Sequence, residues 1–159
     1  MTAPRLLLTL LLAAAVLVTG CGGIGSPSAE EYSDAVVLNR NRVDFVLGRI
    51  TRADSVDELL TRMDEASIVI GKASEELDKL GAPDDYQPEA DDLVDSLAQL
   101  SVDVKATADQ ARIPGFEGLI TETNAISFNS WDDVNTALAG LAGKGIPVTI
   151  LQRHGADPS

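Results

Sequence analysis

Residues 55–83 read SVDELLTRMDEASIVIGKASEELDKLGAP and carry the most regular hydrophobic pattern of the chain. Their apolar residues recur every three or four positions, which is the spacing of one face of an α-helix. Ser55 followed by Glu58 is a capping box that predicts the helix start, and Gly81 followed by Pro83 predicts its end. The apolar stripe consists of Val56, Leu59, Leu60, Met63, Ala66, Ile70, Ala73, Leu77 and Leu80.

Two further long helices are predicted on either side of this segment. The earlier one begins with a second capping box, Ser28 and Glu31, and its stripe contains Tyr32, Val36, Val43, Val46, Leu47 and Ile50, interrupted by the polar Asn39. The later one begins between Asp84 and Pro88 and is broken by the Pro114-Gly115 pair. Its stripe contains Ala90, Leu93, Val94, Leu97, Leu100, Val104, Ala108 and Ala111.

The last third of the chain has a weaker pattern. Residues 116–128 are interpreted as a short helix and a loop, and Ser130 is expected to cap a shorter fourth helix with Trp131, Val134, Leu138 and Leu141 on one face. Residues 148–151 form a short extended piece in this interpretation, and residues 152–159 form a flexible tail. Leu151, between Pro147 and Gly155, is expected to be peripheral, so that its truncation would cost little.

These elements predict the fold class. Short connections between long amphipathic helices imply antiparallel neighbours. We expect an all-α, up-and-down bundle of three long helices and a shorter fourth over residues 29–151. It follows a signal-peptide helix (1–20) and a flexible Gly/Ser-rich tether (21–28).

The charge balance limits the classes of partner. The chain has 12 Lys and Arg against 25 Asp and Glu, a net charge of −13, and Arg5 is the one charged residue among the first twenty. Such a surface repels the phosphates of nucleic acids, so a nucleic-acid partner is not expected. An acidic surface of this kind ordinarily keeps molecules apart, and an electrostatic partner would be cationic.

The N-terminus carries the strongest functional signal. Arg5 precedes the uncharged run LLLTLLLAAAVLV over residues 6–18. At about 1.5 Å per residue this run reaches about 20 Å, short of the ~30 Å hydrocarbon core of a bilayer. The length fits a cleaved signal peptide better than a permanent membrane span.

The run ends in Leu17-Val18-Thr19-Gly20-Cys21, which resembles the lipobox of bacterial lipoproteins. The resemblance covers residues 1–21. It implies that the Cys21 thiol receives a diacylglyceryl group, that signal peptidase II cuts between Gly20 and Cys21, and that the new amino group is acylated, for example with palmitate. The implied location is the outer face of the bacterial cell membrane, held by the covalent lipid on Cys21, because two or three acyl chains anchor stably.

Residues 28–112 resemble the small helical lipoproteins and secreted helical proteins of high-GC Gram-positive bacteria. The matching features are the Leu80-Gly-Ala-Pro83 stop between two long helices rich in Ala, Leu and Asp, and Tyr86 after it. This resemblance implies a fold and a cellular address, and it implies no activity.

The residue types present give little support for catalysis or for metal binding. The sole cysteine is Cys21, committed to lipid, and the sole histidine is His154 in the expected tail. A Ser-His-Asp triad or a Cys/His zinc site therefore lacks its parts, so we expect no catalytic residue, no metal ligand and no cofactor. The acidic run Asp84, Asp85, Glu89, Asp91, Asp92 and Asp95 is interpreted as helix N-terminal carboxylates, with a cation site as the alternative.

Two functions from different classes remain open. The leading interpretation is a non-enzymatic lipoprotein that presents a helical surface to an envelope protein or to a cell-wall partner. The alternative is a carrier of a hydrophobic or lipid-like ligand in an inter-helix cavity, and a small hydrolase is a more distant possibility. The residues expected to line such an apolar pocket are Tyr32, Phe45, Phe116, Phe128 and Trp131.

Overall fold

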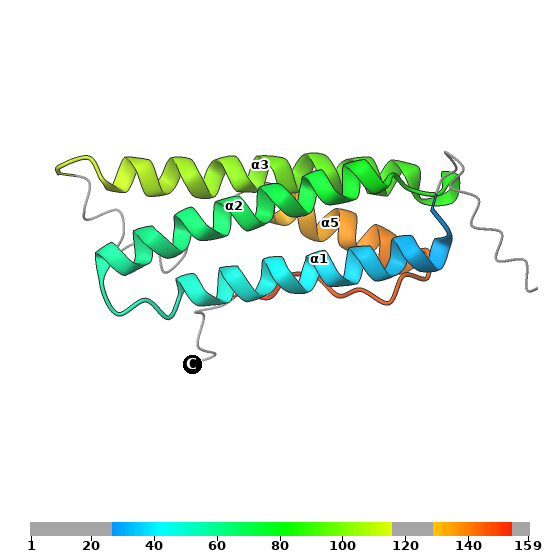
Figure 1. The fold of residues 1–159 in the computed structure, drawn as a ribbon, viewed down its shortest axis with the longest axis horizontal. Coiled ribbons are helices and arrows are strands. Elements are labelled where there is room, and N and C mark those ends of the chain that lie inside the picture. Colours follow the sequence, from blue (N-terminus) through cyan, green and yellow to red (C-terminus); the bar gives the residue numbers. More distant parts are fainter. Residues whose placement is uncertain (1–26, 116–128, 154–159) are drawn as a thin grey trace, which may run out of the picture.

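The computed structural model describes residues 27–115 and 129–153, and within them the chain is an all-α bundle. Its elements are α1 (Ala29–Ile50), α2 (Val56–Leu80), the short 3₁₀ helix η1 (Asp84–Tyr86), α3 (Gln87–Ala111) and α5 (Asn129–Gly143). Consecutive helices run in opposite directions, and α5 packs on α3 behind α2 (Figure 1). The predicted up-and-down bundle of three long helices and a shorter one is confirmed.

The helix ends follow the predicted caps. The Ser28 and Ser55 side chains accept hydrogen bonds from the backbone N–H groups of Glu31 and Glu58, at 3.1 and 3.2 Å. Gly81 ends α2 with a φ of 70°, a left-handed conformation that favours glycine. Each cap satisfies backbone groups that lack a partner inside the helix, so these local sequence signals fix where α1 and α2 start and where α2 stops.

The core is aliphatic and is formed by the predicted stripes. The α2 residues Leu60, Ile70 and Leu77 are buried, as are Leu93 and Leu100 of α3. Asn39 is also buried, and its side-chain oxygen accepts a hydrogen bond from Arg42 at 3.4 Å. One residue of the predicted stripe lies outside this core: Val56, in the first turn of α2, is exposed.

The start of α5 differs from the prediction. The helix begins at Asn129, so Ser130 lies inside its first turn instead of preceding the helix as its cap. The Ser130 hydroxyl donates a hydrogen bond to the carboxylate of Asp103 on α3, at 2.5 Å, and Ser130 is buried. Its role is therefore to join α5 to α3. Trp131, Val134, Leu138 and Leu141 face the core as predicted.

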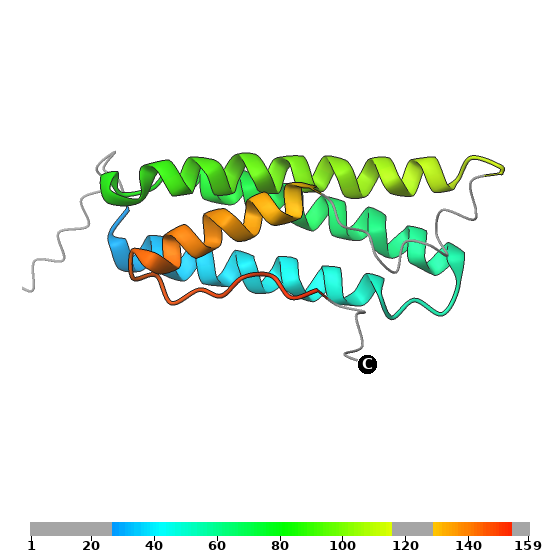
Figure 2. The same cartoon turned by 180° about the vertical axis from the view of Figure 1, so that it is seen from behind.

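The segment after α5 also differs from the prediction. Residues 144–153 return along α1, as Figure 2 shows from behind. Ile146, Val148 and Leu151 are buried, and Leu151 is only 2% exposed, so the expectation that Leu151 is peripheral was wrong. The reason is tertiary: α5 is shorter than α3, and this segment covers the part of the core next to α1.

Polar side chains hold this returning segment. The Arg40 guanidinium donates to the backbone carbonyl of Thr149 at 2.9 Å and also to that of Ile150. Asp44 accepts from the backbone N–H of Gln152 at 2.9 Å, so the first residue of the predicted tail is tied to α1. Backbone groups of an irregular segment need such partners when they leave water, and α1 supplies them.

The packing of the returning segment predicts the effect of truncating Leu151. We expect Leu151→Ala to lower the free energy of unfolding by about 2–5 kcal/mol, because a buried leucine leaves a cavity when it is shortened. Ile150, its neighbour, is 52% exposed and provides the control. Ile150→Ala should change stability by no more than about 0.5 kcal/mol. Urea titration of residues 22–159 checks both, and equal midpoints for the two variants would contradict the packing.

Candidate functional site

The structure does not gather the predicted aromatic pocket into one site. Tyr32 and Trp131 are buried, whereas Phe45 on α1 is 65% exposed and points away from the core. Phe116 and Phe128 lie outside the described residues. Tyr32 lies at the end of the bundle near η1, whereas Trp131 follows Ser130, which is bonded to Asp103 in the second half of α3. The described members of the set therefore do not line one cavity.

The void at the centre of the described bundle is small. Side chains from all four helices and from Leu151 surround a central void of about 10 Å³. A void of this size holds at most about one water molecule, whereas ligand cavities commonly measure about 300–1,000 Å³. The lining is formed by Val36, Arg40, Val43, Leu77, Leu93, Leu97, Val134, Leu138 and Leu151. This central space cannot accommodate a lipid-like ligand without rearrangement.

Tyr32 has an unusual environment for a tyrosine. Its ring stacks on that of Tyr86, with ring centroids 6.0 Å apart, and its hydroxyl is buried without a hydrogen-bond partner among the described residues. Burial, together with the negative charge of Asp91, raises the pKa of Tyr32 to about 12. The stacked pair closes the end of the core where α1 begins and where η1 connects α2 to α3.

The acidic run at the start of α3 spreads over different faces instead of converging. Glu89 pairs with Lys144 at the end of α5, and the Lys144 ammonium also donates to the carbonyl of Asp85 at 2.7 Å. Asp91 accepts from the Gln87 side chain at 2.7 Å. No group of three or more carboxylate, cysteine or histidine side chains within the described residues is arranged to hold a metal ion.

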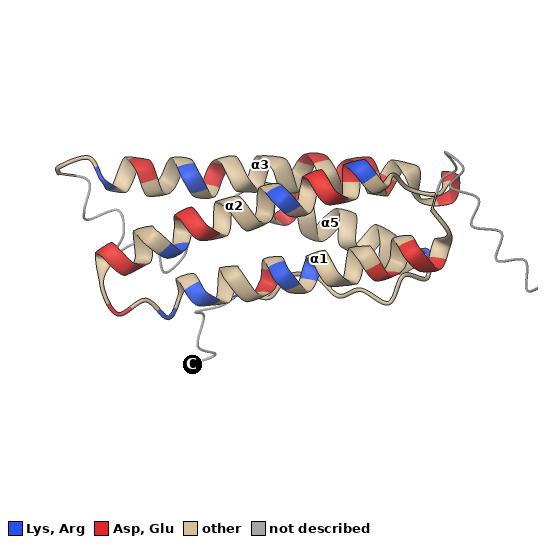
Figure 3. Cartoon of the chain, viewed as in Figure 1, with Lys and Arg blue, Asp and Glu red and all other residues tan. Residues whose placement is uncertain are grey.

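Two of these carboxylates line a groove between α3 and α5. Asp92 and Asp95 face Asp133 across a surface hollow of about 490 Å³, which is completed by Ser96, Gln99, Thr136 and Ala137. Its charged lining residues are all acidic. Figure 3 shows that acidic residues also gather at the end of the bundle where α1 begins.

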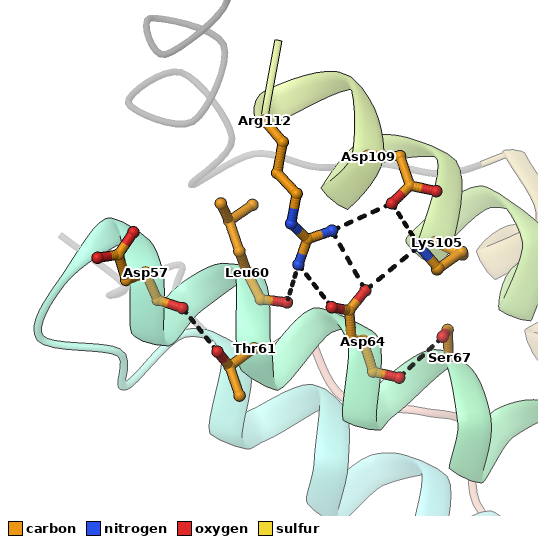
Figure 4. Close-up of polar contacts among 8 residues, drawn as sticks. All are labelled: Asp57, Leu60, Thr61, Asp64, Ser67, Lys105, Asp109 and Arg112. Carbon is orange, nitrogen blue, oxygen red and sulfur yellow. Dashed lines mark hydrogen bonds and ion pairs between the residues drawn. The ribbon is translucent and has the colours of Figure 1, made fainter. Parts of the chain in front are cut away.

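A network of charges joins α2 to α3 near the opposite end of the bundle (Figure 4). The Arg112 guanidinium donates to the Asp64 carboxylate at 2.5 Å and to Asp109 at 3.1 Å, and it also contacts the Leu60 carbonyl at 3.4 Å. Lys105 pairs with Asp109, and lies 3.6 Å from Asp64. The Lys105 hydrogen bond is the main cause that lowers the pKa of Asp109. The groups are partly exposed, so the network links helices and contributes little stability.

The predicted lipidation site, Cys21, and the predicted cleavage point between Gly20 and Cys21 lie outside the described residues, as does His154. No helix of the described part is long and apolar enough to cross a membrane. Comparison of the chain with protein-family models, curated proteins and solved structures finds no match in any of the three. Among the described residues, the candidate functional features are the outer surfaces of the bundle, and the sequence adds the lipobox-like stretch before α1.

The environment of Tyr32 predicts an alkaline titration. One of the two tyrosines should ionise near pH 12 in an absorbance titration at 295 nm, and Tyr32→Phe should remove that step. Because the folded-state pKa is above the unfolded value near 10, the stability from neutral Tyr32 is fully present below pH 10 and is lost toward pH 12. The prediction is contradicted if Tyr32→Phe keeps the helical circular dichroism signal but its absorbance titration loses a step near pH 10.

The charge network predicts a second titration. Carboxyl NMR should show that the pKa of Asp109 lies below its usual value and rises in Lys105→Met, because the paired ammonium stabilises the carboxylate. The stability that the Lys105–Asp109 pair contributes is fully present above the unfolded-state pKa of Asp109. It is lost as the pH falls through the lower pKa of Asp109 in the folded protein. Lys72→Met, which removes a lysine not bonded to Asp109, is the control and should leave that pKa unchanged.

Proposed function

We propose that this chain is a lipid-anchored protein of the outer face of a bacterial cell membrane, without enzymatic activity, that presents its helical bundle to a protein or cell-wall partner in the envelope. The observation that carries this proposal is the lipobox-like stretch Leu17–Cys21, placed directly after the apolar run of residues 6–18. A thiol at that position meets a lipid donor at the membrane surface, because the apolar run ends there.

The position of α1 determines which end of the bundle is attached to the proposed anchor. Seven residues separate Cys21 from Ala29 at the start of α1, and a chain of that length reaches at most about 30 Å. The end of the bundle that contains the start of α1 and η1 would therefore be the end closest to the lipid surface. Glu30, Glu31, Asp84 and Asp85 are exposed at this end. Anionic headgroups repel such carboxylates, which would hold the bundle off the lipid surface and leave its sides accessible to a partner.

The small central void favours a surface function over a carrier function. A lipid-like ligand would have to open the central void of about 10 Å³, at the cost of the contacts among the surrounding aliphatic side chains. The groups that are accessible without such an opening are the charged side chains and the grooves of the outer surface. A partner that recognises shape and charge fits these features.

The anchor is tested by changing its cysteine. In cells fed labelled palmitate, the natural chain should incorporate the label and fractionate with the membrane, whereas Cys21→Ser should incorporate none and accumulate as an uncut precursor. Ser26→Ala, a comparable small change in the same region, should behave like the natural chain. Equal labelling of Cys21→Ser and the natural chain would contradict the proposal.

A further inference from the structure

The returning segment, residues 144–153, fills a groove between α1 and α5. Within the described bundle α1 packs on α2, α2 on α3 and α3 on α5, so α1 and α5 are the outer helices of this series. The segment runs along α1 (Figure 2) and is hydrogen-bonded to both outer helices. Its Ile146, Val148 and Leu151 are buried, and Leu151 reaches the central void. Three apolar side chains of the segment therefore occupy the groove.

Side chains on both walls of the groove bind the backbone of the segment. Arg40 on α1 donates to the carbonyls of two consecutive residues, Thr149 and Ile150. Asn135 on α5 and Asp44 on α1 accept from the N–H groups of the next two residues, at 2.7 and 2.9 Å. Every peptide has such carbonyl and N–H groups, so these contacts recognise a stretched-out chain whatever its side chains are. Backbone hydrogen bonds combined with pockets for spaced apolar side chains are a common way to bind a peptide.

The segment and the groove have opposite charges. Residues 144–153 contain Lys144 and Arg153 and no acidic residue, although the whole chain carries a net charge of −13. Lys144 pairs with Glu89 of α3, and the Arg153 guanidinium lies 3.4 Å from the Asp132 carboxylate of α5. The groove therefore fits a peptide that is apolar in its middle and basic at both ends, and the acidic bundle attracts such a peptide from a distance.

The segment has room to leave the groove. Between α5 and residues 150–153 lies an open surface hollow of about 770 Å³. The chain leaves α5 through Gly145, whose φ of 99° is a left-handed conformation that favours glycine. Because α1 is held by α2, and α5 by α3, the groove keeps both of its walls when the segment detaches. Such a segment can open locally while the rest of the bundle stays folded.

We propose that the space between α1 and α5 is a peptide-binding groove and that residues 144–153 are its built-in, autoinhibitory occupant. The partner is a non-helical segment of another protein, with apolar residues spaced as Ile146, Val148 and Leu151 and with a basic residue at each end. A second copy of this chain fits less well, because two molecules of net charge −13 repel each other. The proposal gives the proposed surface function a partner and rests on that function for the partner's place in the envelope, whereas the groove itself does not depend on the anchor.

The test measures binding of a fluorescent peptide, KGIPVTILQR, which copies residues 144–153, to the full-length chain in mild detergent. The natural chain should bind it weakly, since the built-in segment keeps the groove closed. Leu151→Asp should bind it at least about tenfold more tightly, because a carboxylate at this buried position expels the built-in segment. Ile68→Asp makes the same kind of change at an exposed residue of α2 and should bind like the natural chain.

The role of Arg40 separates peptide recognition from general stickiness. In the Leu151→Asp chain, Arg40→Met should weaken binding of the peptide at least about tenfold, because two carbonyl contacts are lost. Arg42→Met is the matched control on the same helix, since Arg42 pairs with Glu76 of α2, and it should leave peptide binding unchanged. Equal effects of the two substitutions, or equal binding of a scrambled peptide, would overturn the proposal.

Hydrogen exchange of the natural chain tests the opening without any substitution. The amides of Leu151 and Gln152 should exchange in an opening that leaves the amides of α1 and α2 protected. Exchange of these two amides only with the whole bundle would overturn the proposal, as would a helical Leu151→Asp chain that takes up cis-parinaric acid in preference to the peptide. A dimer of the natural chain that is lost in Leu151→Asp would assign the groove to a second copy and overturn the proposed partner.

The groove and the anchor fail in distinguishable ways. Palmitate labelling of the natural chain without peptide binding by Leu151→Asp overturns the groove and leaves the anchor intact. Peptide binding without palmitate labelling supports the groove and removes the anchor.

Discussion

The bundle depends on one constraint: an aliphatic core without a disulfide has to be covered on all sides by packing alone. The chain has a single cysteine, and the described core contains two aromatic side chains, Tyr32 and Trp131. α2 buries its stripe between α1 and α3, but α5 has 15 residues against 25 in α3 and leaves part of α1 uncovered. Residues 146–151 cover that part, and Arg40 supplies hydrogen bonds for their backbone. The irregular segment is therefore as much a part of the core as the helices are.

The same constraint explains which parts of the fold the sequence could predict. Helix positions follow from interactions within a few residues, so the stripe of α2 and the caps at Ser28 and Ser55 could be recognised in the sequence. The burial of Leu151 depends on the length of α5 and on the carbonyl groups that Arg40 reaches from a distance of about a hundred positions. Pro147, four residues after the end of α5, is typical of chain that follows a helix, but a broken helix pattern does not tell whether that chain packs or frays.

The candidate site was harder to predict than the fold, and for two different reasons. Phe45 could have been excluded from the pocket, because at about 100° per residue it lies roughly 200° from the buried Val43 on the same helix. By contrast, the hydrogen bond between Ser130 and Asp103 and the stacking of Tyr32 on Tyr86 link separate elements. Single-sequence patterns contain no signal for such pairs.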